Sequence, residues 1–187
     1  MLQEKLRSTM TDFLEENENY TLTHKIISID DLAHLKKFKC GNGSMDLFLA
    51  VESYPSHIER ESSTTVVYIN DKLVGYYTLR HIKLSSLLTT ITPEEDRDVL
   101  DIARLAVDIQ LQGKYIGTAI MENILKMAVQ LNERFIVLDA LKEKWSWYAK
   151  KFDFEPLFES DIEGSGELVT MLIDLYDQDL IERYYDE

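Results

Sequence analysis

Residues 100–123 restrict the fold more than any other part of the chain, because an apolar segment, a polar turn and an amphipathic helix follow one another directly. Residues 100–107 predict a strand whose buried face changes near Ala103 or Arg104, as it would at a β-bulge. After the turn, apolar side chains recur at three- and four-residue steps. This spacing predicts a helix that begins near Lys114 and buries one stripe of side chains: Ile116, Ile120, Ile124, Met127 and Leu131.

The turn between strand and helix, residues 112–118, has the composition of an anion-binding loop. Gly113 and Gly117 leave room for a ligand close to the backbone. The start of the following helix supplies unpaired amides and the positive end of the helix dipole. We therefore expect the turn to hold a pyrophosphate.

The order of these parts resembles the acetyl-CoA signature of the GNAT N-acetyltransferase family, which is Gln/Arg, two residues, Gly, one residue and Gly/Ala. Gln112 takes the first position and Gly117 the last, whereas Tyr115 replaces the middle glycine and needs backbone angles that suit a residue with a Cβ. The resemblance implies an α/β (α+β) fold, with a mixed central sheet of about six or seven strands flanked by helices and an extra N-terminal helix. It also implies acetyl-CoA as co-substrate, bound by strand and turn residues: Leu105, Ala106, Val107, Gln112, Gly113, Lys114, Tyr115, Ile116, Gly117 and Thr118.

Composition narrows the class of protein. A chain of 187 residues with 45% hydrophobic content predicts one compact domain with a sizeable core. The single cysteine, Cys40, excludes an internal disulfide framework, and we expect a cytoplasmic protein without a membrane span or signal-peptide core. Thirty-four acidic against 20 basic side chains give a formal charge of −14, so any RNA contact needs a local basic patch.

The chain divides by pattern into three parts. Residues 1–20 predict a helical extension from the spacing of their apolar side chains, residues 21–176 the GNAT acetyltransferase domain, and residues 177–187 an acidic tail. Further strands are predicted over residues 21–29, 64–69, 73–79, 135–140 and 168–175. Further helices are predicted through Leu35 and Phe38 with Asp30 or Asp31 as cap, after Gly43 with Ser44 as cap, and around Trp145, Tyr148 and Phe152.

A second resemblance narrows the subgroup. Residues 38–42, Phe-Lys-Cys-Gly-Asn, followed by Met-Asp-Leu-Phe-Leu at 45–49 and Gly-Tyr-Tyr-Thr-Leu at 75–79, look like a GNAT subgroup that includes tRNA-acetylating toxins of toxin–antitoxin pairs. GNAT enzymes usually transfer the acetyl group without a covalent enzyme intermediate. We therefore interpret Cys40 as a buried structural thiol rather than a nucleophile.

A third resemblance lies in residues 147–157, which are similar to the GNAT segment Tyr-x-Lys-x-Gly-Phe-x-Pro. It implies that Tyr148 is the catalytic residue, whose phenol protonates or hydrogen-bonds the departing CoA thiolate. Asp153 replaces the usual glycine at the helix exit. The alternative is that Tyr148 packs in the core with Trp145 and Phe152.

The acceptor amine stays open at this stage. Because the charge is so negative, we expect an N-acetyltransferase that acts directly on an amine of a small molecule or peptide. The alternatives are toxin-type acetylation of aminoacyl-tRNA, with Lys142, Lys144, Lys150 and Lys151 as the densest basic group, and a catalytically inactive acetyl-CoA-binding regulator.

The general base and the partners also stay open. Asp101, Glu94, Glu95 or a water molecule are the candidates for the base, and a homodimer and an antitoxin are the candidate protein partners. None of the four histidines lies in a metal-ligand pattern, so we expect no catalytic metal.

Overall fold

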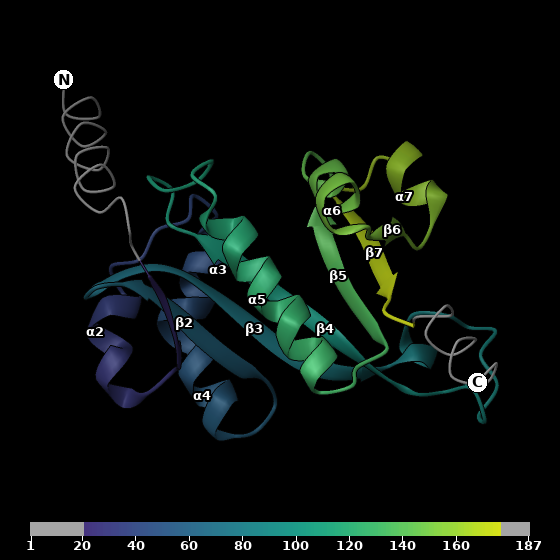
Figure 1. The fold of residues 1–187 in the computed structure, drawn as a ribbon, viewed down its shortest axis with the longest axis horizontal. Helices are drawn as coiled ribbons and strands as arrows, with labels where there is room; N and C mark the ends of the chain where they lie inside the picture. The colour runs from purple at the N-terminus through teal and green to yellow at the C-terminus, as the bar shows by residue number, and fades with distance from the viewer. Residues whose placement is uncertain (1–20, 177–187) are drawn as a thin grey trace, which may run out of the picture. The chain divides into compact units, whose positions relative to one another are not determined.

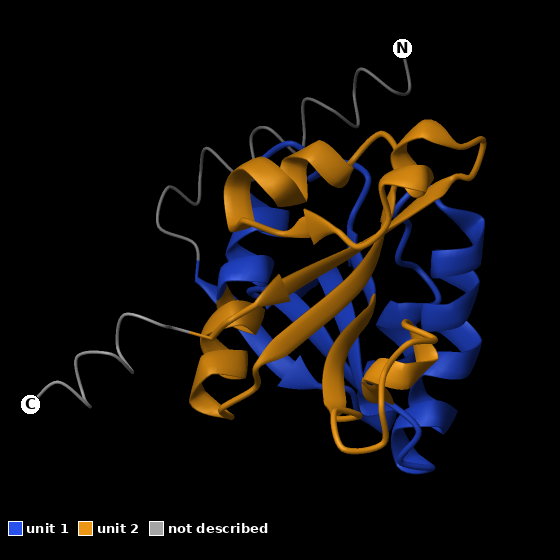
Figure 2. Ribbon diagram, turned by 90° about the vertical axis from the view of Figure 1, so that its right-hand side faces the viewer, with its two compact units in different colours: residues 1–80, 104–122 blue, residues 81–103, 123–187 orange. Residues whose placement is uncertain are grey.

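The computed structural model describes residues 21–176. The predicted N-terminal extension and the acidic tail lie outside the described residues, so these domain boundaries stay predictions. Backbone contacts divide the chain into two compact units, coloured separately in Figure 2. Unit 1 comprises residues 1–80 and 104–122, and unit 2 comprises residues 81–103 and 123–187.

The described strands form one mixed sheet with the order β1-β2-β3-β4-β5-β7-β6 (Figure 1). Pairing is antiparallel for β1 with β2, β2 with β3, β5 with β7 and β6 with β7, whereas β4 and β5 are parallel. The seven-stranded mixed sheet confirms the predicted fold class. The strands are β1 (Leu22–Ile26), β2 (Ser63–Ile69), β3 (Lys72–Lys83), β4 (Asp98–Val107), β5 (Phe135–Leu141), β6 (Glu155–Pro156) and β7 (Leu168–Asp174).

The helices connect these strands in the predicted order. No helix within residues 21–176 combines the length and the apolar character that a membrane span requires. The segment η2 is a π-helix, whereas η1 and η3 are 3₁₀ turns. The bounds are η1 (Ile29–Asp31), α2 (Leu32–Leu35), α3 (Gly43–Leu47), η2 (Phe48–Glu52), α4 (Ser53–Ile58), η3 (Leu84–Ser86), α5 (Ile116–Gln130), α6 (Trp145–Phe152) and α7 (Glu159–Glu163).

Unit 1 has helices on both faces of its strands. On one face, α2 and η2 bury apolar side chains against Tyr76 of β3, whose hydroxyl donates a hydrogen bond of 2.9 Å to the carbonyl of Met45. On the other face, a Cβ at Gly75 would lie 3.0 Å from Cδ1 of Ile120 in α5. Alternation along β3 explains this arrangement, because neighbouring strand residues point to opposite faces.

Unit 2 has a smaller apolar cluster of its own. Leu84, Val99 and Val137 are buried together, and Phe135 packs against them. At the start of β5, the guanidinium of Arg134 pairs with the carboxylate of Asp174 at 2.9 Å. These contacts tie β4, β5 and β7 into one body within the unit.

The two predicted helix caps differ in outcome. Asp31 occupies the N-cap position of α2, as predicted, but its side chain makes no cap hydrogen bond, because its carboxylate accepts from the backbone amide and hydroxyl of Ser28, the residue before η1. Asn42, not Ser44, caps α3, since its side-chain oxygen accepts from the amides of residues 44 and 45.

The helix stripe of α5 also differs at its end. The helix begins at Ile116 and ends at Gln130, so Leu131 lies beyond it and is exposed. Met127 is half-buried, whereas the fully buried positions are Ile116, Ile120, Met121, Ile124 and Ala128. The helix begins two residues after the predicted start near Lys114, because Tyr115 has left-handed backbone angles.

Candidate functional site

All ten predicted cofactor-binding residues belong to unit 1, whereas Tyr148 and the three candidate bases belong to unit 2. Within unit 1, the last residues of β4 are held against β3. A Cβ at Gly75 would lie only 2.9 Å from the carbonyl oxygen of Ala106, so the glycine permits this close approach. The amide of Asp108 donates to the carbonyl of Val74 at 2.9 Å, which fixes where β4 ends and the turn begins. Ala106 and Val107 are buried and Leu105 is half-buried.

The turn after β4 has two residues with left-handed backbone angles. Gly113 has φ 78° with open space around its Cα, and Tyr115 has φ 68°. Left-handed residues next to right-handed ones turn successive amides toward one side, the geometry that binds anions. Tyr115, which replaces the middle glycine of the family signature, therefore has a conformation that glycine adopts without steric cost.

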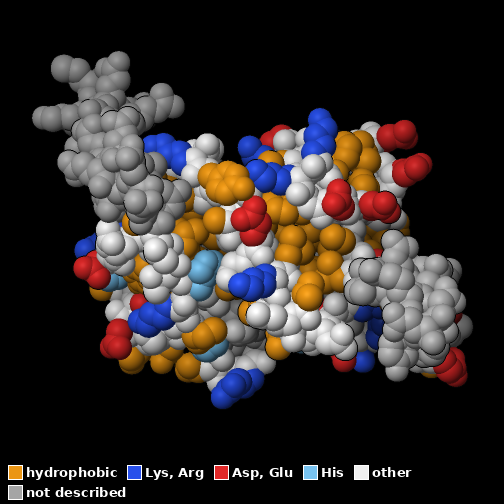
Figure 3. All heavy atoms as spheres, viewed as in Figure 1, with side chains coloured by type: hydrophobic (Ala, Val, Ile, Leu, Met, Phe, Trp, Pro, Cys, Tyr) orange, Lys and Arg blue, Asp and Glu red, His pale blue; other side chains and the backbone are white. Residues whose placement is uncertain are grey.

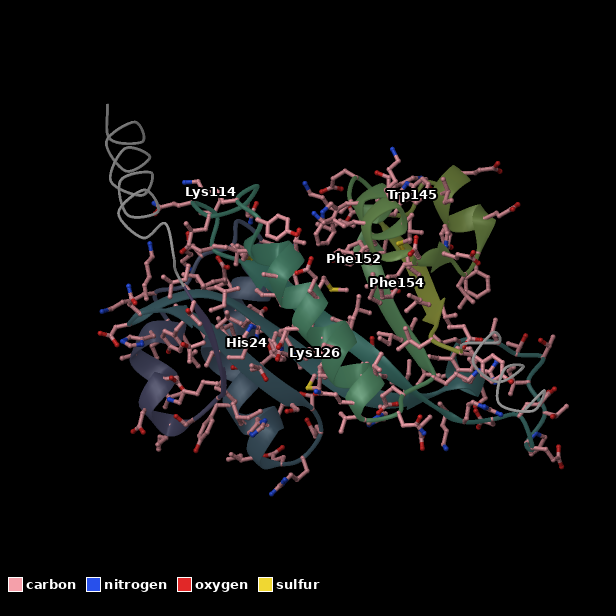
Figure 4. The ribbon with its side chains drawn as sticks, viewed as in Figure 1. His24, Lys114, Lys126, Trp145, Phe152 and Phe154 are labelled. Atoms are coloured by element: carbon pink, nitrogen blue, oxygen red, sulfur yellow. The ribbon has the colours of Figure 1, made fainter. Side chains whose placement is uncertain are left out.

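The start of α5 follows at once. The amide of Ala119 donates to the carbonyl of Tyr115 at 3.0 Å, so the amides of residues 116–118 belong to the first helical turn, whose N–H groups have no acceptor within the helix. Lys114 lies on the turn just before this helix (Figure 4). The hydroxyl of Tyr115 donates to the Glu122 carboxylate at 3.2 Å, along the outside of α5. These residues fit a pyrophosphate with backbone donors and one cation.

The side chain of Gln112 makes structural hydrogen bonds within unit 1. Its amide nitrogen donates to the carbonyl of Cys40 at 2.7 Å and to the carbonyl of Val107 at 3.1 Å. It therefore connects the turn to the end of β4 and to the segment before α3. Sequence reasoning assigned Gln112 to the cofactor and missed this contact, because it spans 72 positions of the chain.

The segment 38–42 packs against the same turn. The amide of Ile109 donates to the carbonyl of Lys39 at 2.8 Å, and a Cβ at Gly41, φ 89°, would lie 2.9 Å from Cδ1 of Ile109. The amide of Cys40 donates to the carboxylate of Asp46 at 2.8 Å. The Phe-Lys-Cys-Gly-Asn step is thus a support for the anion-binding turn.

Cys40 is buried, as predicted for a structural thiol. Burial raises the pKa of the thiol to about 11, and the Asp46 carboxylate adds to the effect, whereas a backbone hydrogen bond with Asn42 lowers the pKa. A thiol with this pKa holds its proton at neutral pH and is a poor nucleophile.

Arg104 is a charged group of unit 1. The sequence analysis named it only as one of two possible positions of the β-bulge. Its guanidinium carbon lies 3.6 Å from the ring centroid of Phe48 in the π-helix η2, a cation–π contact. Phe48 in turn stacks on Tyr76 at 6.4 Å between centroids. The sequence contains no signal for this contact, because the π-turn that positions Phe48 is not visible in a helical apolar pattern.

Tyr148 lies in unit 2 on α6. Its ring packs against Trp147 and Phe154, with centroid distances of 4.7 and 6.2 Å, rather than against Trp145 and Phe152 as the structural alternative expected. No residue in the range 21–176 hydrogen-bonds its hydroxyl. Burial raises the pKa of Tyr148 to about 12, so the phenol keeps its proton. It is therefore a hydrogen-bond donor throughout the physiological pH range.

The other predicted groups of unit 2 are spread over separate elements. Asp101 is a buried residue of β4, whereas Glu95 is exposed and accepts from the amide and hydroxyl of Thr92 in a local turn. Among the lysines of the predicted basic group, Lys142 donates to the carbonyl of Gly164. Within residues 21–176, no three His, Cys, Asp or Glu side chains are grouped in a way that could hold a metal ion.

Comparison with known proteins agrees with this arrangement. Residues 29–154 match the model of the acetyltransferase (GNAT) family. A tRNA-acetylating toxin of Mycobacterium tuberculosis (strain ATCC 25618 / H37Rv) is 26% identical over 145 residues, which cover 73% of this chain and 85% of the toxin.

Solved structures share the fold. The AtaT toxin complexed with acetyl-methionyl-tRNAfMet has a TM-score of 0.62 at 23% identity, and the match covers 88% of this chain and 99% of AtaT. A tyrosine-to-phenylalanine mutant of AtaT, bound to acetyl-CoA and the C-terminus of the antitoxin AtaR, also has a TM-score of 0.62 at 23% identity, covering 89% of this chain and 99% of the toxin. Because the family model matches more than half of the residues, the chain belongs to the acetyltransferase (GNAT) family, the enzymes that take their acetyl group from acetyl-CoA.

Proposed function

We propose that this acetyltransferase acetylates the α-amine of aminoacyl-tRNA, as a toxin-type enzyme. The observation that carries the proposal is the 26% identity, over 85% of its length, to a protein named as a tRNA-acetylating toxin. The small-molecule or peptide acceptor that the net charge suggested has no comparable support. The net charge is also a weak argument against RNA binding, because the described residues of unit 1 contain as many basic as acidic side chains.

In the proposed complex, the turn at residues 112–118 binds the pyrophosphate of acetyl-CoA. The amides of Ile116, Gly117 and Thr118 donate to the phosphate oxygens, and Lys114 adds a charge-assisted contact. Gly113 and Tyr115, both with positive φ, direct the turn's amides to the same side. Backbone groups of residues 105–107 pair with the pantetheine arm in the manner of an added strand.

The proposed chemistry needs one donor at the sulfur and one acceptor for the amine proton. The neutral amine attacks the thioester carbonyl, a C–N bond forms, the C–S bond breaks, the nitrogen loses one proton and the departing thiolate gains one. Tyr148 is the proposed donor, since its pKa of about 12 keeps its proton available. Asp101, Glu94, Glu95 and water remain the candidates for the acceptor.

The alternative of an inactive binding protein rested on Tyr115 and Asp153, which replace two family glycines. Both residues have left-handed backbone angles, with φ 68° and 60°. At both positions the backbone thus has a conformation that glycine adopts without steric cost, so the two replacements are compatible with a glycine-like turn, which supports turnover. An antitoxin is the proposed protein partner, in line with the AtaR complex of the structurally similar AtaT.

The test is acetyl transfer from radiolabelled acetyl-CoA to a pool of charged tRNAs. We expect acid-precipitable label that mild base releases as an N-acetyl amino acid, because the aminoacyl ester is base-labile. Deacylated tRNA is the substrate control. Gly117→Glu is the enzyme control, since a carboxylate in the first turn of α5 would repel the pyrophosphate.

Two outcomes would contradict the proposal. One is label in free amines or peptides with none in charged tRNA. The other is acetyl-CoA binding, measured by calorimetry, without transfer to any charged tRNA in the pool. The second outcome would return the inactive regulator as the explanation.

A further inference from the structure

The charge of the described chain is unevenly distributed between its units. The described residues of unit 1 include nine basic and nine acidic side chains, whereas those of unit 2 include eight basic and fifteen acidic ones. Acidic side chains gather over α7, at the upper right of Figure 3. A polyanion is therefore repelled least by unit 1.

Within unit 1, the basic side chains are concentrated at the end that carries the anion-binding turn. Residues 34–39, His-Leu-Lys-Lys-Phe-Lys, contain three lysines and no acid. Lys39 lies next to the turn, because its carbonyl accepts from the amide of Ile109. Lys72 also lies near Lys114, whose charge lowers the pKa of Lys72 together with burial, the larger cause, while Asp108 opposes both.

A hollow of about 200 Å³ opens between these elements, and we call it the basic hollow. Its walls carry His34 and Lys37 from the end of α2 and Lys72 from the start of β3. Phe38 and Leu73 are its buried apolar lining, and Asp71 and Asp108 also line it.

The carboxylates do not cancel the basic charge at this end. One Asp108 oxygen accepts from the amide of Gln110 at 2.9 Å, and Asp46 lies 3.6 Å from Lys39. With Asp71 and with Glu122, which accepts from the Tyr115 hydroxyl, four acids accompany five lysines at this end of the unit: Lys36, Lys37, Lys39, Lys72 and Lys114. Lys36 and Lys37 are both exposed, so their ammonium groups can reach a ligand outside the hollow.

We propose that the basic hollow, with Lys36, Lys37 and Lys72, binds the phosphodiester backbone of the acceptor tRNA. The inference rests on the proposed function and assigns the RNA contact to unit 1, in place of the group of Lys142, Lys144, Lys150 and Lys151 in unit 2. Lysines around a partly apolar hollow suit a backbone phosphate flanked by sugars. The hollow adjoins the proposed cofactor turn through Asp108, so the bound RNA lies beside the segment that carries acetyl-CoA.

The test compares two triple variants with the same change in charge. Lys36→Gln, Lys37→Gln and Lys72→Gln remove the proposed contacts, and Lys142→Gln, Lys144→Gln and Lys150→Gln are the matched control in unit 2. The probe is fluorescein-labelled deacylated tRNA, whose Kd is measured by anisotropy over a salt series. A double variant of the exposed Lys36 and Lys37 repeats the measurement without any change at the half-buried Lys72.

We expect the unit 1 triple variant to weaken tRNA binding roughly tenfold or more, and to reduce the slope of log K against log salt by about 2 to 3. The unit 2 control keeps the affinity and slope of the natural protein, and acetyl-CoA affinity is unchanged in both. Equal tRNA affinity in all three proteins, or a larger loss in the control, would overturn the proposal.

Two further results would also overturn it, and one separates it from the proposed function. A parallel loss of acetyl-CoA affinity would assign the lysines to the cofactor. Normal tRNA binding with lost affinity for an acidic protein partner would assign them to that partner. If the triple variant loses tRNA binding while the natural protein transfers no acetyl group to charged tRNA, the RNA surface stands and the proposed function fails.

Discussion

The side-chain amide of Gln112 donates a hydrogen bond of 2.7 Å to the backbone carbonyl of Cys40, 72 positions earlier in the chain. With its second bond, to Val107, the same nitrogen holds together the turn, the end of β4 and the segment that leads into α3. Gln112 is the first residue of the family signature, and Cys40 belongs to the subgroup motif. A hydrogen bond therefore connects the two motifs directly.

The first prediction follows from this contact. Gln112→Ala removes two hydrogen bonds that hold the turn, each worth about 1 kcal/mol. We expect acetyl-CoA to bind roughly ten- to thirtyfold more weakly, measured by calorimetry, because the amides of the turn lose their fixed direction. Gln110→Ala is the matched control, since the side chain of Gln110 makes no hydrogen bond within residues 21–176. Unchanged cofactor affinity in Gln112→Ala would show that the hydrogen bonds of the Gln112 side chain are not needed to hold the turn.

Tyr115 provides the second prediction. A left-handed residue with a Cβ costs about 1–2 kcal/mol relative to a right-handed one, and glycine avoids this cost. Tyr115→Gly should keep acetyl-CoA affinity within about twofold, because the amide direction is preserved. Tyr115→Val should weaken binding roughly tenfold, since a β-branched residue strongly disfavours φ near 68°. Similar cofactor affinities in the two variants, compared by calorimetry, would contradict a role for the backbone angle.

The sequence predicted the longer strands, the hairpin and the longer helices in their order along the chain, because their apolar patterns are local. It did not predict β6, α7 or the order of the strands in the sheet. The prediction of helix caps from the sequence failed where a polar side chain had several possible hydrogen-bond partners. Asp31 stands at the N-cap position of α2 without a cap hydrogen bond, because its carboxylate is buried in a network with Lys25 and Tyr68. At α3, Asn42 rather than Ser44 is the cap. Such competition depends on residues brought together by the fold, so no local pattern contains it.

The candidate site was predictable to a similar extent. The glycines located the turn because they permit a close approach to the backbone, and Gln112 located it because it matches the first position of the family signature. The left-handed angle of Tyr115 and the basic hollow were not predictable, because both depend on how segments 34–39, 71–73 and 108–115 come together. The sequence analysis singled out the lysines of unit 2, whereas in unit 1 Lys72 and Lys114 are far in sequence from the lysines of residues 36–39 and approach them only in the folded chain.

Cys40 provides the third prediction. Because its pKa is about 11, the thiol should react with a disulfide reagent at neutral pH far more slowly than free cysteine, and denaturant should restore the fast reaction. Cys40→Ala should retain transfer activity and lose about 1 kcal/mol of stability from the lost burial. The measurements are thiol titration with and without urea, and a urea unfolding curve. Loss of activity at full cofactor affinity would instead indicate a role for the thiol in chemistry.

Asp153 provides the fourth prediction. It ends α6 with φ 60°, where the family has glycine. Asp153→Gly should stabilise the protein by about 1 kcal/mol, or roughly 2–4 °C in Tm, by removing the left-handed penalty at the helix end. Asp153→Ala keeps the penalty, loses the side chain's tolerance of this conformation, and should lower Tm. A lower Tm for the glycine variant than for the natural protein would contradict this account of the helix end.

The last prediction concerns Tyr148 and the pH dependence of transfer. A phenol loses its proton only above its pKa, and burial raises the pKa of Tyr148 to about 12, so its donor is present at every pH below about 11. The acceptor amine must be neutral, and α-amines have pKa values of about 7.7–8.0. We therefore expect kcat/KM to rise through the amine's pKa and to show no fall up to about pH 10, the usual tyrosine pKa. Rates are taken at short times because aminoacyl esters hydrolyse in base.

Tyr148→Phe removes this donor and leaves the ring packing with Trp147 and Phe154 in place. We expect kcat to fall by roughly 10²-fold or more while acetyl-CoA affinity and Tm stay near those of the natural protein, because the thiolate must then leave without a proton. Trp147→Phe is the packing control, since it changes the neighbouring ring but keeps the hydroxyl. If Tyr148→Phe retains full kcat, or if the natural enzyme and the variant lose activity alike above pH 9, the proton comes from another group and Tyr148 is a residue of the aromatic core.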